Sequence, residues 1–188
     1  MAQKINDMEK VVLKFLELDD KDTDFVNKDE LLEACKQEKI DENIIKESLR
    51  YVDADENGRI SLDEFCNGLG LQASEMRKER AERRYERQGV VAPIDPSISI
   101  IASSMSQEKQ QTITEKYIQL MEKTTGKPED VDKVAKELKT FLDDKYGRAW
   151  QVIIMMGSYW MYFSHMPLLS LQFRHNQYIG LVWRTPTA

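Results

Sequence analysis

Apolar residues recur at helical spacing in four segments through the first third of the chain, with polar loops between them. Residues 5–18 place valine, phenylalanine and leucine on one face, which is the pattern of an amphipathic helix. Three further helices are predicted at residues 30–37, after the N-cap Asp41, and from about Ser61 through Phe65. These residues predict an all-α domain over residues 1–74.

The two polar loops, DDKDTDFVNKDE at residues 19–30 and DADENGRISLDE at residues 53–64, repeat one another. In the second loop, oxygen-bearing groups stand at positions 1, 3, 5, 7, 9 and 12, as a helix-loop-helix calcium site requires. These six positions are Asp53, Asp55, Asn57, Arg59, Ser61 and Glu64. Arg59 would contribute its backbone carbonyl, and Gly58 supplies the sharp turn. The alternative, a solvated acidic turn, would not require this spacing.

The first loop is a poor calcium site. Lys21 stands at position 3, where an oxygen ligand is needed, and Asp24 replaces the glycine at position 6. Val26 can still pair with Ile60 across a short two-stranded contact between the loops. The sequence therefore predicts a paired helix-loop-helix domain that binds one Ca²⁺ per chain.

Residues 75–96 join this domain to the rest of the chain. EMRKERAERRYERQ is almost entirely charged and predicts a rigid, solvent-exposed helix continuing the fourth helix. The alternative is a basic surface for a target or for peripheral association with a membrane. Gly89, Pro93 and Pro96 then indicate an extended linker.

Residues 97–188 show a different pattern, typical of an α+β domain. A strand candidate at residues 97–105 precedes two amphipathic helices, the first capped by Ser106. Four strand candidates follow, at residues 150–156, 158–163, 168–173 and 178–183. Residues 149–173 carry no charged side chain, but polar residues interrupt them and the apolar runs have strand length, so strands are favoured over a transmembrane span.

Charge and composition exclude several classes of function. The chain has a net charge of −6, and its acidity lies in residues 1–74, with 19 acidic against 10 basic residues. No region is basic enough to indicate nucleic-acid binding. The start of the chain lacks a secretory signal, and Cys35 and Cys66 form no zinc or disulfide pattern, which favours the cytosol. His165 and His175 lack neighbours at metal-ligand spacing, and no catalytic constellation is present, so an enzyme is not predicted.

The C-terminal pattern resembles the dynein light chain. The resemblance rests on Tyr146 and Trp150 within YGRAWQVII, on GSYWMYF, and on the order of strands and helices. With the acidic domain before it, the whole chain resembles the tegumental calcium-binding, allergen-like proteins of parasitic flatworms. That resemblance implies a cytoplasmic calcium-binding antigen beneath the surface membrane of the tegument.

Dynein light chains exchange a strand to form homodimers and bind extended peptides along the edge of that strand. The matching segment implies peptide-binding residues Ser158, Tyr159, Trp160, Met161 and Tyr162. Of these, Ser158 and Tyr159 match the family, whereas the other three differ from its usual residues.

Two functional hypotheses remain open at this point. In the first, the chain is a calcium-responsive adaptor with one working loop and a dimerising, peptide-docking domain. In the second, it is a structural scaffold in which calcium only stabilises the N-terminal domain.

Overall fold

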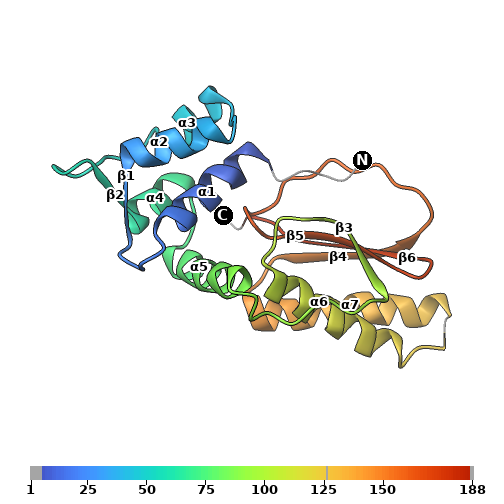
Figure 1. Ribbon diagram of the computed structural model, residues 1–188. Coiled ribbons are helices and arrows are strands. Elements are labelled where there is room, and N and C mark those ends of the chain that lie inside the picture. Colours follow the sequence, from blue (N-terminus) through green and yellow to red (C-terminus); the bar gives the residue numbers. More distant parts are fainter. Residues whose placement is uncertain (1–5, 126, 187–188) are drawn as a thin grey trace. The chain divides into compact units, whose positions relative to one another are not determined.

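The computed structural model describes residues 6–125 and 127–186, and these divide into two compact units that meet in sequence at Gln88 and Gly89 (Figure 1). The N-terminal unit is helical with one short two-stranded ladder. The C-terminal unit is a four-stranded sheet with two helices.

The N-terminal unit contains the predicted helices. Its elements are α1 (Asp7–Leu18), β1 (Phe25–Asn27), α2 (Lys28–Gln37), α3 (Glu42–Ser48), β2 (Arg59–Ser61), α4 (Leu62–Leu69) and α5 (Ala73–Arg87). The predicted cap Asp41 is present, and Ser61, near which the fourth helix is predicted to start, also caps its helix: both side chains accept backbone N–H groups in the first turns of α3 and α4. These bonds satisfy amides that the helices themselves leave without partners.

The core of this unit lies between the helices. Phe15 of α1 stacks on Phe65 of α4, with ring centroids 4.3 Å apart. Both cysteines, Cys35 on α2 and Cys66 on α4, are fully buried and reduced. Burial raises the pKa of each thiol to about 11, so both stay protonated at neutral pH.

The charged connector helix differs from the prediction. Gly70 adopts a left-handed conformation that ends α4, so α5 is a separate helix rather than a continuation of it. It is not a fully solvated spacer either, because Glu79 and Arg80 are only 2% and 4% exposed. The reason is electrostatic: arginines of α5 pair with carboxylates of the first loop.

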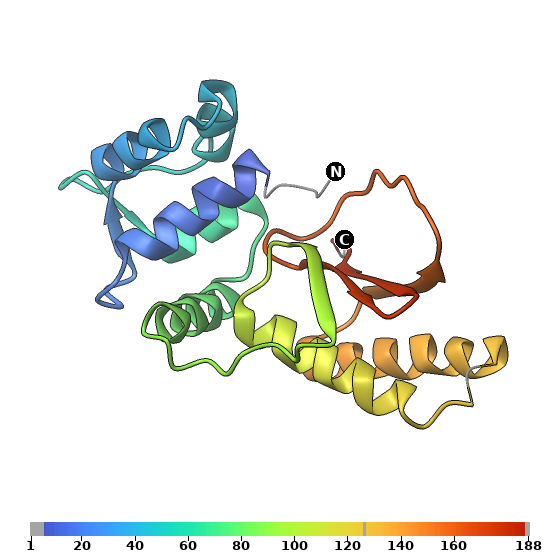
Figure 2. The ribbon, with the colours of Figure 1, turned by 45° about the vertical axis from the view of Figure 1, so that its right-hand side comes forward.

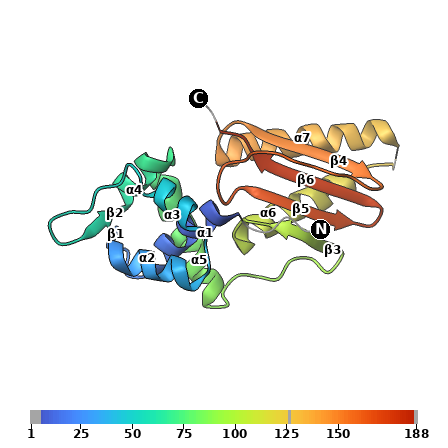
Figure 3. The same cartoon turned by 90° about the horizontal axis from the view of Figure 1, so that it is seen from above.

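The C-terminal unit comprises β3 (Ile98–Ser103), α6 (Gln107–Met121), α7 (Pro128–Tyr146), β4 (Trp150–Met156), β5 (Ser170–His175) and β6 (Tyr178–Arg184). The strands pair antiparallel in the order β3-β5-β6-β4 (Figure 3). Figure 1 shows α6 and α7 covering one face of this sheet. The predicted cap Ser106 accepts the Lys109 N–H at the start of α6.

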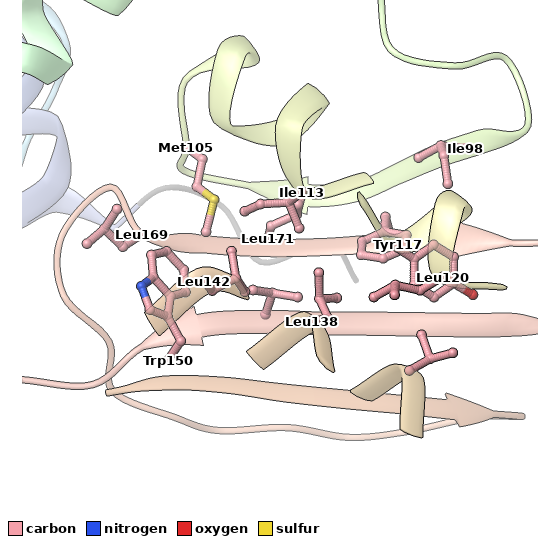
Figure 4. Packing of buried hydrophobic residues seen from close by; sticks show 13 residues of the cluster. Ile98, Met105, Ile113, Tyr117, Leu120, Leu138, Leu142, Trp150, Leu169 and Leu171 are labelled. Atoms are coloured by element: carbon pink, nitrogen blue, oxygen red, sulfur yellow. The ribbon is translucent and has the colours of Figure 1, made fainter. Parts of the chain in front are cut away.

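Side chains from the sheet and from both helices form the core of this unit (Figure 4). Trp150 of β4, Tyr117 of α6 and Leu138 of α7 are fully buried in it. Phe173 lies directly opposite Gly180 on the neighbouring strand, and a Cβ built at Gly180 would be 2.3 Å from the Phe173 ring. Gly180 therefore provides the space that the ring occupies.

The strand predicted at residues 158–163 is not formed. The sheet of the described chain has three strands after α7 rather than four, and the chain between β4 and β5 loops away from the sheet (Figure 2). A strand forms only by pairing with a neighbouring strand, and the segment at residues 158–163 pairs with neither edge strand of the described sheet, β3 or β4. Its side chains nevertheless alternate, with Tyr159, Met161 and Phe163 half-buried and the residues between them exposed.

Candidate metal centre

The second loop is bent around Gly58. This residue has a φ of +71°, in the left-handed region where a side chain is disfavoured. The Gly58 N–H donates to the Asp55 carbonyl over 2.9 Å, and the Asp55 N–H donates to the Arg59 carbonyl over 2.7 Å. These bonds close the turn and hold residues on either side of Gly58 near one another.

The two loops are tied together by the β1–β2 ladder. Val26 lies opposite Ile60, as predicted, and both side chains are buried. The Leu62 N–H, at the start of α4, also donates to the Asp24 carbonyl of the first loop over 2.8 Å. The conformation of one loop therefore constrains that of the other.

Asp55, at loop position 3, is held by its own loop. One carboxylate oxygen accepts the Asn57 and Arg59 N–H groups over 2.9 and 2.8 Å. The other accepts Nε and Nη2 of Arg59 over 3.0 and 2.9 Å. The backbone N–H of Arg59, with help from its guanidinium, lowers the pKa of Asp55. The carboxylate is therefore ionised at neutral pH, as a calcium ligand must be.

Glu64 and Ser61, at positions 12 and 9, form a capping box at the start of α4. The Ser61 hydroxyl donates to Glu64 Oε2 over 2.7 Å, and the Glu64 N–H donates to Ser61 Oγ over 3.2 Å. Asp53 and Asn57 are exposed to solvent. Within residues 6–125 and 127–186, no three or more acidic, histidine or cysteine side chains converge enough to hold a metal ion.

The donor chemistry of the second loop nevertheless fits calcium. Three carboxylates, an amide oxygen, a hydroxyl and a backbone carbonyl are hard oxygen donors on one turn whose glycine has the required conformation. Binding would require Glu64 to exchange Ser61 for the ion and Asp55 to release the Arg59 side chain. These six predicted residues thus lie on one loop, where Asp55 is hydrogen-bonded to Asn57 and Arg59, and Ser61 is hydrogen-bonded to Glu64.

Replacing Arg59 with glutamine should strengthen calcium binding. The side chain at position 7 is not a ligand, whereas its guanidinium holds the Asp55 carboxylate. Because exposed ion pairs are weak, we expect a gain of about two- to fivefold in affinity. Isothermal calorimetry of both proteins measures it. Arg50→Gln is the matched control, since it removes the same charge at an exposed pair with Glu47; an equal gain there would attribute the effect to net charge alone.

The first loop is organised differently. Asp19, at position 1, accepts the Thr23 and Asp24 N–H groups over 2.8 and 2.9 Å. Asp24, at position 6, has a φ of +61°, so it adopts the conformation that glycine has in the second loop. Lys21 is exposed. The carboxylates of this loop face arginines of α5 instead of an open cavity.

Sequence reasoning missed this role of Arg77, Arg80 and Arg84. The signal was present, because spacings of three and four residues place all three on one helical face. Their partners lie more than 50 residues away, however, and spacing along one helix does not identify a distant partner.

The residues predicted to bind a peptide lie in the segment between β4 and β5. Tyr159 is anchored, since its hydroxyl donates to Gln172 Oε1 of β5 over 2.7 Å. Trp160 and Tyr162 are 90% and 101% exposed. Ser158 is also exposed, whereas Met161 is half-buried. The five residues therefore form one stretch in which the rings of Trp160 and Tyr162 lie in solvent.

Comparison with known proteins assigns each of the two units to a protein family. Residues 8–69 match the EF-hand domain pair, and residues 97–185 match dynein light chain type 1. A tegument antigen of Schistosoma mansoni is 40% identical over 184 residues, spanning 98% of this chain and 97% of the relative. The chain belongs to the tegument antigen family. It is a calcium-binding EF-hand protein with a dynein light chain-like domain, and neither matched family is enzymatic.

Two further proteins are similar to this tegument antigen family member. Antigen Sm21.7 of Schistosoma mansoni is 37% identical over 180 residues, covering 96% of this chain and 97% of the relative. The solved dynein light chain-like domain of a Fasciola hepatica calcium-binding protein is 45% identical, with a TM-score of 0.49; the match covers 52% of this chain and all of that domain.

Among the helices that the structure describes in this family member, none combines the length and the apolar character needed to cross a bilayer.

Proposed function

We propose that this protein is a calcium-responsive adaptor of the tegument that binds one calcium ion per chain in its second loop. The supporting observation is the contrast between the loops. The second carries a complete set of oxygen donors around Gly58, and its Asp55 contacts an exposed arginine, Arg59, whereas the carboxylates of the first contact the buried Arg80. Calcium would supply positive charge among the second loop's acids and draw Glu64 away from Ser61.

Calorimetric titration of the intact, calcium-free protein tests this proposal. We expect one calcium ion per chain. Two equivalent sites would contradict it, as would calcium binding that persists after Asp53→Ala is combined with Glu64→Gln. The double variant removes a carboxylate charge at each end of the second loop and leaves the first loop intact.

The C-terminal domain would supply dimerisation and peptide docking. The stretch from Ser158 to Phe163 has the alternating burial of a strand but no partner strand within the described chain. Pairing with a second copy would satisfy its backbone groups and cover Trp160 and Tyr162. An extended peptide could then add to the edge that this strand creates.

Light scattering of the full chain measures this association. We expect the mass of a dimer for the natural protein and of a monomer after Trp160→Glu with Tyr162→Glu. Both side chains are exposed in a single chain, so the variant should retain its circular dichroism spectrum. A natural protein that is monomeric at micromolar concentration would contradict the proposal.

A scaffold role, in which calcium only stabilises the N-terminal domain, is supported by one observation. Arginines of α5 already hold the first loop, which limits how far the helix pair can open. Binding of a hydrophobic dye with and without calcium separates the two roles. Enhanced dye binding with calcium supports the adaptor, and unchanged dye binding supports the scaffold.

The name of one relative, a tegument antigen of Schistosoma mansoni, supports a location in the tegument. We propose that the protein acts in the cytoplasm beneath the surface membrane. Immunogold labelling of tegument sections tests the location, and signal confined to the outer surface would contradict it.

A further inference from the structure

Helix α5 presents a row of arginines to the first loop. Arg77, Arg80 and Arg84 lie three and four residues apart, on one face of the helix. Arg80 is at the centre of this row, and its side chain is only 5% exposed. A charge so well buried requires compensating partners, because water no longer solvates it.

The guanidinium of Arg80 contacts three carboxylates of the first loop. Its Nη1 donates to Asp19, whose side chain is fully buried. Its Nε lies 2.8 Å from an oxygen of Asp22, and its Nη2 lies 2.9 Å from an oxygen of Asp24. Each nitrogen of the guanidinium therefore lies within ion-pair distance of a different carboxylate.

The same carboxylates shape the backbone of the loop. Asp19 accepts the N–H groups of Thr23 and Asp24 as well as the Thr23 hydroxyl, which lies 2.9 Å away. The loop thus curls around a carboxylate whose other contact is the guanidinium of Arg80. In a calcium-loaded loop, the aspartate at position 1 would contact the ion where Asp19 here contacts Arg80.

Arg84 and Arg77 reinforce this arrangement from either side. Arg84 makes a bidentate pair with Asp22, with both N–O distances 2.6 Å. Arg77 contacts Asp24 over 2.8 Å and reaches Asp63, next to the last ligand position of the second loop, over 3.2 Å. Through this arginine, α5 touches both loops of the pair.

We propose that Arg80 is the resident cation of the first loop, so that α5 is an internal ligand of the EF-hand pair. Its guanidinium contributes the positive charge that an ion contributes in a working loop, and it does so permanently. The first loop is therefore held in shape without calcium. This inference concerns the first loop and α5 alone and does not depend on calcium binding by the second loop.

Chemical rescue tests the proposal. In the full chain with excess chelator, Arg80→Ala should accelerate hydrogen exchange at the Thr23 and Asp24 amides by about 10- to 100-fold. Millimolar methylguanidinium, far below denaturing concentrations, should restore protection because it places the missing cation among the three carboxylates. Tetramethylammonium, which cannot donate hydrogen bonds, should not. Arg87→Ala, which removes an exposed arginine at the C-terminal end of the same helix, is the matched control.

Unchanged exchange in Arg80→Ala would overturn the proposal, and so would lost protection that methylguanidinium fails to restore. If Arg80→Ala does not fold, Asp22→Asn combined with Asp24→Asn decides the question. Asparagine also tolerates the positive φ of both positions, so this variant removes charge with little backbone strain. Natural exchange rates at the Thr23 amide in that variant would equally overturn the proposal.

Discussion

Replacing Glu64 with glutamine should weaken calcium binding at the second loop by about 100-fold, since the bidentate carboxylate at position 12 closes the coordination shell. Glutamine can still accept the Ser61 N–H, so the capping box of α4 is retained. The loss would therefore reflect the missing carboxylate charge and not an unfolded helix. Calorimetry gives the affinity, and circular dichroism reports the helix content.

Glu30→Gln is the matched control, because Glu30 holds position 12 of the first loop. We expect it to leave the calcium affinity and the stoichiometry unchanged. If Glu30→Gln caused the larger loss, the assignment of the ion to the second loop would be wrong.

Truncation of Trp150 to alanine should destabilise the C-terminal unit by about 3–5 kcal/mol. The indole is fully buried at the start of β4, in the core that α6 and α7 cover (Figure 4). Its removal leaves a cavity between the sheet and the helices. Urea unfolding followed by the fluorescence of the two remaining tryptophans, Trp160 and Trp183, measures the free energy of unfolding.

Trp150→Phe provides the comparison for this prediction. The indole N–H has no hydrogen-bond partner among the described residues, so its loss breaks no such bond. We therefore expect Trp150→Phe to lower the free energy of unfolding markedly less than Trp150→Ala, because phenylalanine fills much of the same space. If the two substitutions lowered the free energy of unfolding equally, the cavity would not be the cause of the destabilisation.

Local signals in the sequence were sufficient for most of the fold. Asp41, Ser61 and Ser106 mark helix starts because a short polar side chain satisfies first-turn amides regardless of distant contacts. The ligand spacing of the second loop is likewise a property of one short stretch. The family resemblance, confirmed by comparison, extended these local signals to both domains.

Features that depend on distant partners could not be predicted in this way. A row of arginines on a helix is compatible with solvent, and only the fold brings Arg80 to Asp19, 61 residues earlier in the chain. In the same way, the alternation in residues 158–163 is that of a strand, but alternation does not supply the neighbouring strand. The paired state of Asp55 and Arg59 also depends on the curvature of the loop around Gly58.

The two units carry different intrinsic reporters. Both cysteines of the chain lie in the N-terminal unit, whereas all three tryptophans lie in the C-terminal unit. Thiol alkylation requires Cys35 or Cys66 to become accessible, so its rate follows the opening of the helical unit, while indole emission follows the sheet. The natural chain can thus reveal, without added labels or truncation, whether its halves unfold together or separately.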